Sequence, residues 1–325
     1  MTSRRWAMPA LLALVVVLAI LSVAVGRVTL TWDMWKAQDP VSRAILIELR
    51  LPRAILGVLV GASLGLAGAA MQGYLRNALA EPGTLGVSAM AALGAVLSIF
   101  FNIAGLHPWV LPICGVIGGM TGMAALFALS GMTASVLSLV LSGIILSALA
   151  VAGISLALSL SPSPWAATEI VRWMLGGLTD RSFDELTIAT PLIVVGCIAV
   201  LGCRRSLDAL TLGETGARSL GIDLNRAQWQ LALGIGLIVG GSTAVTGMIG
   251  FVGLIVPHLM RPLVGSRPGA LLVPSAIAGA ALVLAGDIVV RLLPGGSELQ
   301  LGVVMSLVGA PFFFVLLHSM RRKLT

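Results

Sequence analysis

Side chains that could carry out chemistry are few in this chain, and their spacing favours packing over catalysis. His107, His258 and His318 each lie near the end of an apolar stretch, and none has a partner at a useful spacing. An interfacial or packing role fits these histidines better than a catalytic or haem-handling role. We therefore predict no catalytic residue in this chain.

The cysteines are equally poor candidates for chemistry. They are odd in number, lie in or next to apolar stretches and lack metal-ligand spacing (Cys114, Cys197 and Cys203). Packing is the simplest role for such cysteines. We predict neither a disulfide nor a metal site.

Nucleotide hydrolysis is not expected of this chain. The sequence contains no GxxxxGK[ST] loop of the kind that cradles nucleotide phosphates. The two lysines, Lys36 and Lys323, follow Trp35 and Arg322 instead of glycine. Any ATP-driven step would therefore need a partner protein.

One pair of charges stands inside an apolar stretch. Asp287 precedes Arg291 by one helical turn, so the two side chains can pair on one face of a helix. Pairing would lower the cost of placing each charge near a membrane boundary. A structural pair and a part of an outward-facing docking surface are both open interpretations.

The longest polar interruption in the second half of the chain is RRSLDALTLGETGARSLGIDLNR, residues 204–226. Glu214 precedes Arg218 by four residues, the favourable order for an ion pair on a helix. Apolar residues recur at helical spacing, and glycines stand where turns would end (Leu207 and Leu210; Ala217, Leu220 and Leu224; Gly213 and Gly221). The pattern fits two short helices lying against a partner about as well as a solvated basic loop.

Composition decides what kind of fold must position these residues. Hydrophobic residues make up 58% of the 325 residues and charged residues only 10%, against roughly a quarter in soluble domains. Most apolar runs approach the roughly 20 residues that a helix needs to cross a bilayer, which excludes a porin-like barrel. We predict an all-α, polytopic membrane helical bundle that forms one domain over residues 1–325.

About ten transmembrane helices are expected, with both termini in the cytoplasm. Their expected positions are Trp6–Val25, Ala54–Leu75, Leu85–Ala104, Trp109–Leu129, Ser135–Leu160, Leu186–Leu201, Ala227–Gly241, Met248–Val264, Leu271–Leu284 and Leu301–Leu317. An even number places the basic residues near both termini on the cytoplasmic side, as the positive-inside tendency requires. The run 227–264 is the least certain, since it fits two short spans around Gly240–Thr243 or one span and a re-entrant piece.

The distribution of charge adds two expectations. The net charge of +7 fits basic cytoplasmic loops, and without an aromatic-basic patch it gives no reason to expect nucleic acid as a partner. Residues 204–226 then lie in the cytoplasm. The basic residues from Arg27 to Arg53 fall on the outer side against the usual tendency, so they call for a function there.

Several long motifs resemble those of one transporter family. They are LRLPR (49–53), GAAMQGYLRNALAEPGTLGVS (68–88), LGETGARSLGI (212–222), GFVGLIVPHLMR (250–261) and GAPFFFVLL (309–317). In this order they resemble the permease subunits of bacterial ABC importers for iron-siderophores, haem and cobalamin, the FecCD/BtuC-like family. The resemblance covers nearly the whole chain.

The resemblance implies a permease that carries an iron chelate (a ferric siderophore or haem) or cobalamin across the inner membrane. It implies pairing with a second copy, as a homodimer, or with a close homologue. It also implies two cytoplasmic ABC ATPase subunits, which would bind ATP and Mg, and a periplasmic or extracellular substrate-binding protein. No cofactor is expected in this chain itself.

The resemblance also assigns roles to residues. Glu214, Arg218, Leu220 and Gly221 match positions in the ATPase-coupling helices. Three basic residues match positions that meet acidic residues of the binding protein (Arg50, Arg53 and Arg291). The turn 133–138, with Ser135 and Val136, resembles the cytoplasmic gate, and 165–177 resembles a short outer helix.

Two other functions remain as alternatives. A stand-alone secondary transporter coupled to an ion gradient would need ionisable or unwound elements near the bilayer midplane, and such elements are scarce in this sequence. A membrane assembly protein without transport fits the glycine-rich spans and the polar segments on both sides less well. The sequence does not distinguish among the chelates.

Overall fold

The protein is an all-helical bundle, as the sequence predicts. The computed structural model describes residues 3–26, 40–130, 136–161, 163–293 and 299–321, and within them every regular element is a helix. The elements are α1 (Ser3–Ala24), α3 (Pro40–Ala44), η1 (Ile45–Arg50), α4 (Leu51–Tyr74), α5 (Val87–Phe100), η2 (Ala104–Leu106), α6 (Val110–Ser130), α7 (Val136–Ser159), α8 (Pro164–Met174), α9 (Phe183–Gly202), α10 (Arg204–Ala209), η3 (Leu210–Leu212), α11 (Gly213–Ser219), α12 (Leu224–Thr246), α13 (Val252–Val264), α14 (Pro268–Leu292) and α15 (Leu301–Arg321).

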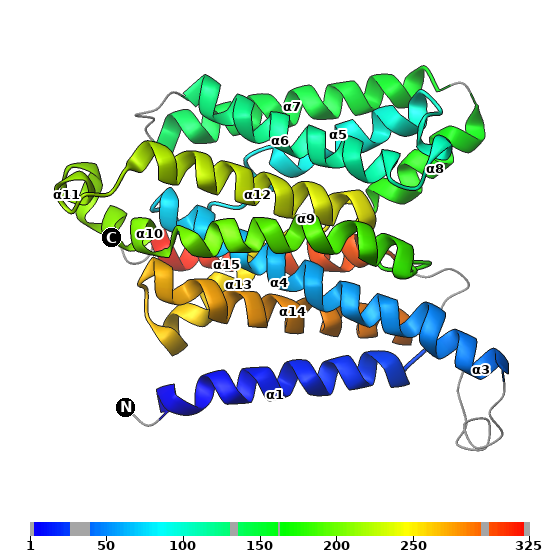
Figure 1. The fold of residues 1–325 in the computed structure, drawn as a ribbon, viewed down its shortest axis with the longest axis horizontal. Coiled ribbons are helices and arrows are strands. Elements are labelled where there is room, and N and C mark those ends of the chain that lie inside the picture. Colours follow the sequence, from blue (N-terminus) through cyan, green and yellow to red (C-terminus); the bar gives the residue numbers. More distant parts are fainter. Residues whose placement is uncertain (1–2, 27–39, 131–135, 162, 294–298, 322–325) are drawn as a thin grey trace.

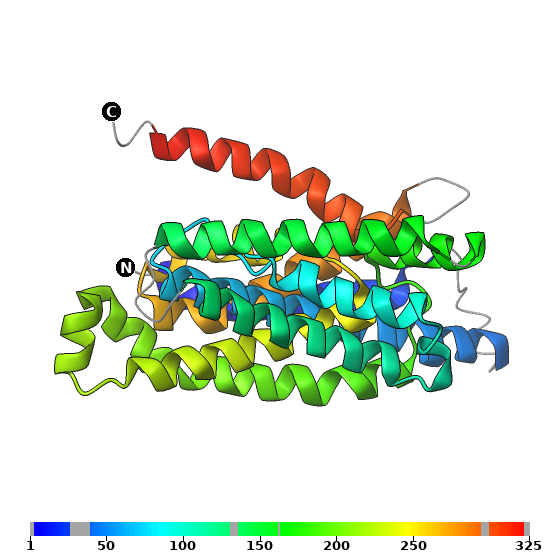
Figure 2. The same ribbon diagram turned by 90° about the horizontal axis from the view of Figure 1, so that it is seen from above.

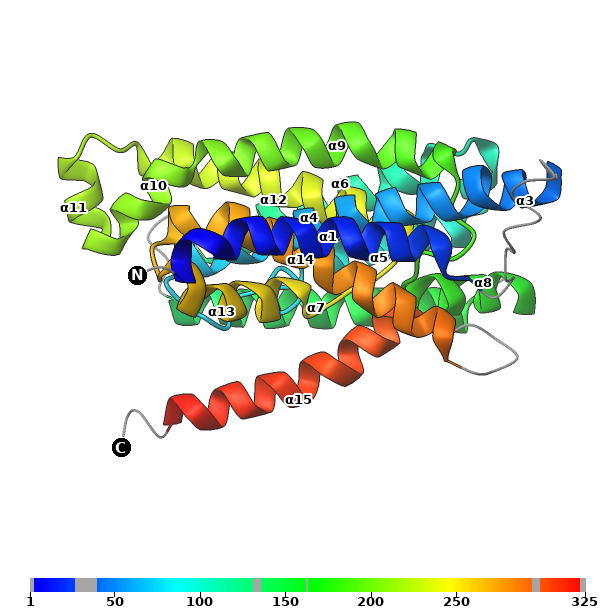
Figure 3. The same ribbon diagram turned by 90° about the horizontal axis from the view of Figure 1, so that it is seen from below.

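The long helices run side by side along one direction, so the bundle has two ends (Figure 1). One end carries α10 and α11, together with the beginning of α1 and the far end of α15, and is called the loop end here (Figures 1 and 3). The opposite end carries α3 and α8 (Figure 1). Each of the ten predicted spans coincides with a long helix or with α5, α13 or α15.

Seven helices of the described chain are long and apolar enough to cross a membrane, and three shorter apolar helices accompany them. The long ones begin at Trp6, Pro40, Val110, Leu137, Phe183, Leu224 and Pro268. The shorter ones span Val87–Phe100, Val252–Val264 and Leu301–Leu316. This is a multi-pass membrane protein, while the number of crossings and the side of the termini stay predictions.

The uncertain run 227–264 forms two helices, but the break does not lie where the sequence suggested. Gly240 and Gly241 stay inside α12 because they give a neighbouring helix room: a Cβ at Gly240 would meet Val116 of α6. The chain leaves the helix at Gly247, which adopts a positive φ of 67°. Just before it, the Thr246 carbonyl accepts a hydrogen bond from Gly177 N–H (2.7 Å). The expectation of a break at residues 240–243 was therefore wrong.

Close helix contacts use the glycines that recur every fourth residue. A Cβ at Gly61 or Gly65 of α4 would meet the backbone of α14, at Gly279 and Ser275 respectively. On the other side of the contact, a Cβ at Gly279 would meet the Gly61 carbonyl. Small residues allow such approach and its dispersion contacts in lipid. These glycines therefore serve close helix packing.

Helix α15 departs from the rest of the bundle. Its first turn packs against the bundle, where the Gly302 N–H donates to the Gly176 carbonyl (2.9 Å). From there it runs outward, and its far end stands apart from the other helices, although Phe312 near its middle still contacts His258 of α13 (Figures 2 and 3). Leu307, Phe314 and Val315 on this helix are 69%, 72% and 65% exposed. The chain alone leaves much of this apolar helix uncovered.

Candidate functional site

The loop end carries two short helices, α10 and α11, joined by the single turn η3. Leu207, Leu210 and Ala217 are buried and hold these helices to each other and to the bundle. Gly213 and Gly221 take positive φ values of 84° and 77°, so each can end a turn that a larger residue would strain. Of the two interpretations left open for 204–226, the structure shows the pair of short helices.

A polar anchor that the sequence did not reveal fixes this segment to α14. Asp208 accepts a hydrogen bond from the backbone N–H of Gly269 (2.7 Å). It also forms a salt bridge with Arg267, whose Nε donates to it at 2.9 Å. Gly269 lies in the first turn of α14, where backbone N–H groups lack helical partners and attract a carboxylate. A displacement of α10 would therefore act directly on α14.

The outer surface of the segment presents apolar side chains beside charges. Leu212 and Leu220 are 66% and 63% exposed, while Ala217, which shares the predicted helical face of Leu220, is buried. Glu214 and Arg218 are also exposed, and no ion pair joins them in the described chain. Beside them lies a hollow of about 470 Å³, lined by residues that include Leu212, Leu220 and Arg205. We call this surface the coupling surface.

At the opposite end, three helices meet at a buried charge cluster. Arg53 of α4 contacts both carboxylate oxygens of Asp287 on α14, at 2.8–3.2 Å. Arg291, one turn after Asp287, pairs with the same carboxylate. Its Nη1 also donates to the Ser22 and Val25 carbonyls of the α1 end (2.6 and 2.9 Å). The cluster ties α1, α4 and α14 together, and Asp287 is only 1% exposed.

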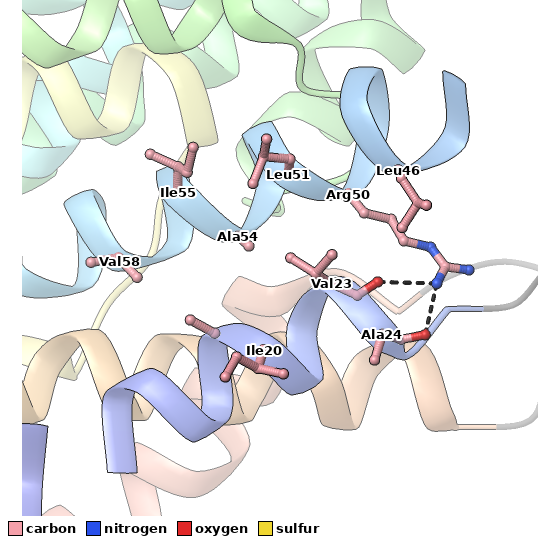
Figure 4. Close-up of a pocket in the computed structure, with 10 residues that line it drawn as sticks. Ile20, Val23, Ala24, Leu46, Arg50, Leu51, Ala54, Ile55 and Val58 are labelled. Carbon is pink, nitrogen blue, oxygen red and sulfur yellow. Dashed lines mark hydrogen bonds between the residues drawn. The ribbon is translucent and has the colours of Figure 1, made fainter. Parts of the chain in front are cut away.

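Arg50 lies on the same end and also binds α1. Its Nη1 donates to the carbonyls of Val23 and Ala24 at 3.1 and 2.7 Å (Figure 4). An apolar crevice of about 600 Å³ extends from it between α1 and α4. Arg50, Arg53 and Arg291 are thus only 6%, 9% and 6% exposed. Each contacts another helix of the same chain. Their predicted contact with a binding protein stays a prediction.

More accessible arginines share this end. Arg43 on α3 is exposed, and the side chain of Arg172 on α8 is 69% exposed in a loose pair with Asp180 (3.3 Å). Helix α8 itself confirms the short helix predicted within 165–177; it starts at a Ser163 cap whose Oγ accepts from Ala166 N–H. Arg43 belongs to the basic stretch 27–53 expected on the outer side, and its exposure depends on how α3 lies.

The predicted gate falls mostly outside the described residues. Ser135 is not among them, and Val136 is described only as the first residue of α7. The gate assignment stays a prediction.

His258 and Cys203 fit packing roles, whereas His107 and His318 are exposed. The ring of His258 lies edge-on to Phe312, with centroids 5.8 Å apart. Cys203 is 1% exposed, and burial raises the pKa of its thiol to about 11. Within the described chain, no group of three or more His, Cys, Asp or Glu side chains lies close enough together to hold a metal ion.

Comparison with known proteins gives the family. A family model described as the FecCD transport family matches residues 14–319. The chain belongs to this family. It is 34% identical over 320 residues to the vitamin B12 import system permease protein BtuC of Vibrio vulnificus, covering 97% of this chain and 95% of that protein. It is 36% identical over 308 residues to the Fe(3+) dicitrate transport system permease protein FecD of Escherichia coli, covering 93% and 95%.

A solved structure agrees with this assignment. It is described as an inward-facing conformation of an ABC transporter assigned to the metal-chelate type. The match has a TM-score of 0.85 and 32% identity, and covers 95% of this chain and 98% of that one. The predicted family is confirmed, and this FecCD-family chain is a permease subunit of the ABC importer class.

Proposed function

We propose that this permease imports a metal chelate across the inner membrane, driven by ATP hydrolysis in two partner ABC ATPase subunits. The coupling surface carries the proposal, because it offers exposed leucines and an exposed Arg218 on helices fixed to α14 through Asp208. Such a surface can bind a partner and pass its movement to the bundle. ATP and Mg would be bound by the ATPases.

The orientation follows from the same surface. With the loop end in the cytoplasm, residues 204–226 lie where basic loops are favoured and where an ATPase can reach them. The opposite end then faces outward, toward a substrate-binding protein. Arg50, Arg53 and Arg291 are the proposed docking residues there, and the exposed Arg43 and Arg172 add to the positive charge of this end.

A second permease, either another copy or a homologue, completes the proposed assembly. Helix α15 supports this step, because its far end stands away from its own bundle and the helix exposes large apolar side chains (Figure 2). A neighbouring permease would cover that helix. The substrate path would then lie between the two permeases, where alternating access shifts the packing of helices.

The proposed substrate is an iron chelate (a ferric siderophore or haem) or cobalamin. The names of the two relatives support this class, since one imports vitamin B12 and the other ferric dicitrate. An iron chelate is the broader class and is the first choice. Uptake, or ATPase activity stimulated by each chelate with its binding protein, would identify the substrate.

ATPase binding tests the proposal directly. In Leu212→Ser/Leu220→Ser, two leucines that would be buried by the partner lose their apolar contacts, each worth about 1.5–3 kcal/mol at full burial. We expect ATPase affinity to fall at least about tenfold, the equivalent of about 1.4 kcal/mol. Leu220→Met keeps the volume and should bind normally. Glu214→Ala/Arg218→Ala should weaken docking or uncouple transport.

The alternative, a stand-alone ion-coupled transporter, gives the opposite results. The purified chain alone would then drive uptake along an ion gradient, and no P-loop ATPase would co-purify with it. Full transport in both the leucine and the charge variants would also remove the coupling role.

A further inference from the structure

A second cleft at the loop end combines basic groups that the coupling surface does not use. It has a volume of about 390 Å³ and lies among the end of α4, the turn that follows it, η3 and the region where α13 passes into α14. Its polar lining consists mainly of Gln72, Arg76, Thr211, Arg261 and Ser266. We call it the basic cleft. No Asp or Glu is among its lining residues.

Arg261 on α13 is half-buried in this cleft without an acidic partner. Its Nη2 donates to Oε1 of Gln72 at 2.7 Å. Gln72 is 4% exposed, and its Nε2 donates to the Gly253 carbonyl at 3.1 Å, so its oxygen is held toward Arg261. In the described part of the chain no carboxylate pairs with Arg261. A desolvated guanidinium with one neutral acceptor favours an added anion.

Arg76 enters the cleft from a strained position. It follows the end of α4 with a φ of 48°. The N–H of Arg76 donates to the Gly73 carbonyl (3.4 Å), and the N–H of Asn77 donates to the Gln72 carbonyl (3.2 Å). Glycine usually takes this place at a helix end, because a side chain strains the backbone. An arginine kept there suggests that its side chain has a use.

The side chain of Arg76 is exposed and has no hydrogen bond or ion pair in the described chain. The nearby carboxylate of Asp208 already serves Arg267 and Gly269. The basic cleft is thus lined by two arginines and by two hydroxyl residues, Ser266 and Thr211, and the Thr211 hydroxyl donates to the Asp208 carbonyl (2.7 Å). Guanidinium groups match the oxygens of phosphate with paired hydrogen bonds.

We propose that the basic cleft binds a phosphate-bearing anion, either the headgroup of an anionic phospholipid or free phosphate. Basic pockets between transmembrane helices near the cytoplasmic surface suit such headgroups. The bound group would connect the end of α4 through Arg76 with α13 through Arg261. Thr211 of η3 would link it to the segment that carries the coupling surface.

Binding to the purified full-length chain tests this proposal. One arm titrates inorganic phosphate in detergent, and the other compares nanodiscs of phosphatidylglycerol with nanodiscs of phosphatidylcholine. We expect Arg76→Gln/Arg261→Gln to lower anion affinity at least tenfold. Arg226→Gln removes the same charge from an exposed position at the same end, outside the cleft, and should leave the affinity unchanged.

Arg76→Gly separates a binding role from a structural one. Glycine relieves the positive φ, so the variant should unfold at the same or a higher temperature, yet it should bind the anion more weakly. Saturable binding of phosphate supports the site with a free anion as its source. Preference for phosphatidylglycerol without phosphate binding supports the lipid. Absence of both, or wild-type affinity in Arg76→Gly and in the double variant, overturns the proposal.

Discussion

Asp287 is the residue on which the order of the end opposite the loop end depends. It is buried, and its one carboxylate serves Arg53 and Arg291, which arrive from different helices. Arg291 in turn holds the end of α1 through the Ser22 carbonyl. Loss of the carboxylate would leave two buried guanidinium groups without this partner.

The stability of an Asp287→Asn variant tests this dependence. Breaking a buried ion pair by removing one partner costs about 3–5 kcal/mol, because the remaining charge is left desolvated. We expect a loss of this order, measured as denaturant unfolding in micelles. Asp180→Asn is the matched control, since its pair with Arg172 is exposed and worth at most about 1 kcal/mol. Equal stability of the two variants would contradict the cluster's role.

Part of this charge cluster could be predicted from the sequence. Asp287 and Arg291 are one helical turn apart, so periodicity alone predicted that they could pair. Arg53 lies 234 positions away from Asp287, and no local pattern reports such a contact. The same holds for Gln72 with Arg261 and for Asp208 with Gly269. Each depends on how separate helices pack.

The contact between α4 and α14 shows the same limit for whole elements. Glycines repeated every four residues in α4 are typical of a close helix contact, but their spacing does not name the neighbouring helix. Gly279 of α14 is that neighbour for Gly61. The glycines around 240 looked like a break and instead serve close packing, while the break follows Gly247. Glycine suits both tasks, so composition alone could not choose.

Replacing Gly279 with alanine tests the close contact. The new Cβ would clash with the backbone carbonyl of Gly61, which is not a flexible side chain that can move aside. Overpacking of this kind typically costs about 1–3 kcal/mol. We expect a lower thermal unfolding midpoint in detergent. In Gly105→Ala the new Cβ meets open space, so the unfolding midpoint should stay unchanged within error. A similar loss in this control would show that the Gly279 contact does not account for the effect.

For the whole molecule, the sequence predicted an all-helical membrane bundle and located its long helices, because apolar length is a strong signal. It could not show which side chains of each end are exposed. Leu220 and Arg43 are exposed, whereas Arg50, Arg53 and Arg291 are largely covered by their own chain. Exposure depends on the arrangement of α1, α3 and η3, which periodicity does not determine.

Charge reversal at the end opposite the loop end tests the proposed docking of an acidic binding protein. Arg43→Glu/Arg172→Glu should weaken docking at low salt without lowering thermal stability, and the effect should shrink as salt screens the charges. Arg50→Glu/Arg53→Glu should lower both docking affinity and stability, since Arg53 also pairs with Asp287. Binding-protein titrations at two salt concentrations, with melting curves, separate the effects. Unchanged affinity in both variants at low salt would remove this end as the docking surface.

Because of the glycine contact between them, α4 and α14 can move together as one rigid unit. Helix α4 has 24 residues, or about 36 Å at 1.5 Å per residue. Asp208 holds the near end of α14, and Asp287 joins the far ends of both helices. A tilt of roughly 5° about the middle would move each end by about 1.6 Å. A movement of the coupling surface could thus be transmitted to the end opposite the loop end without any helix having to bend.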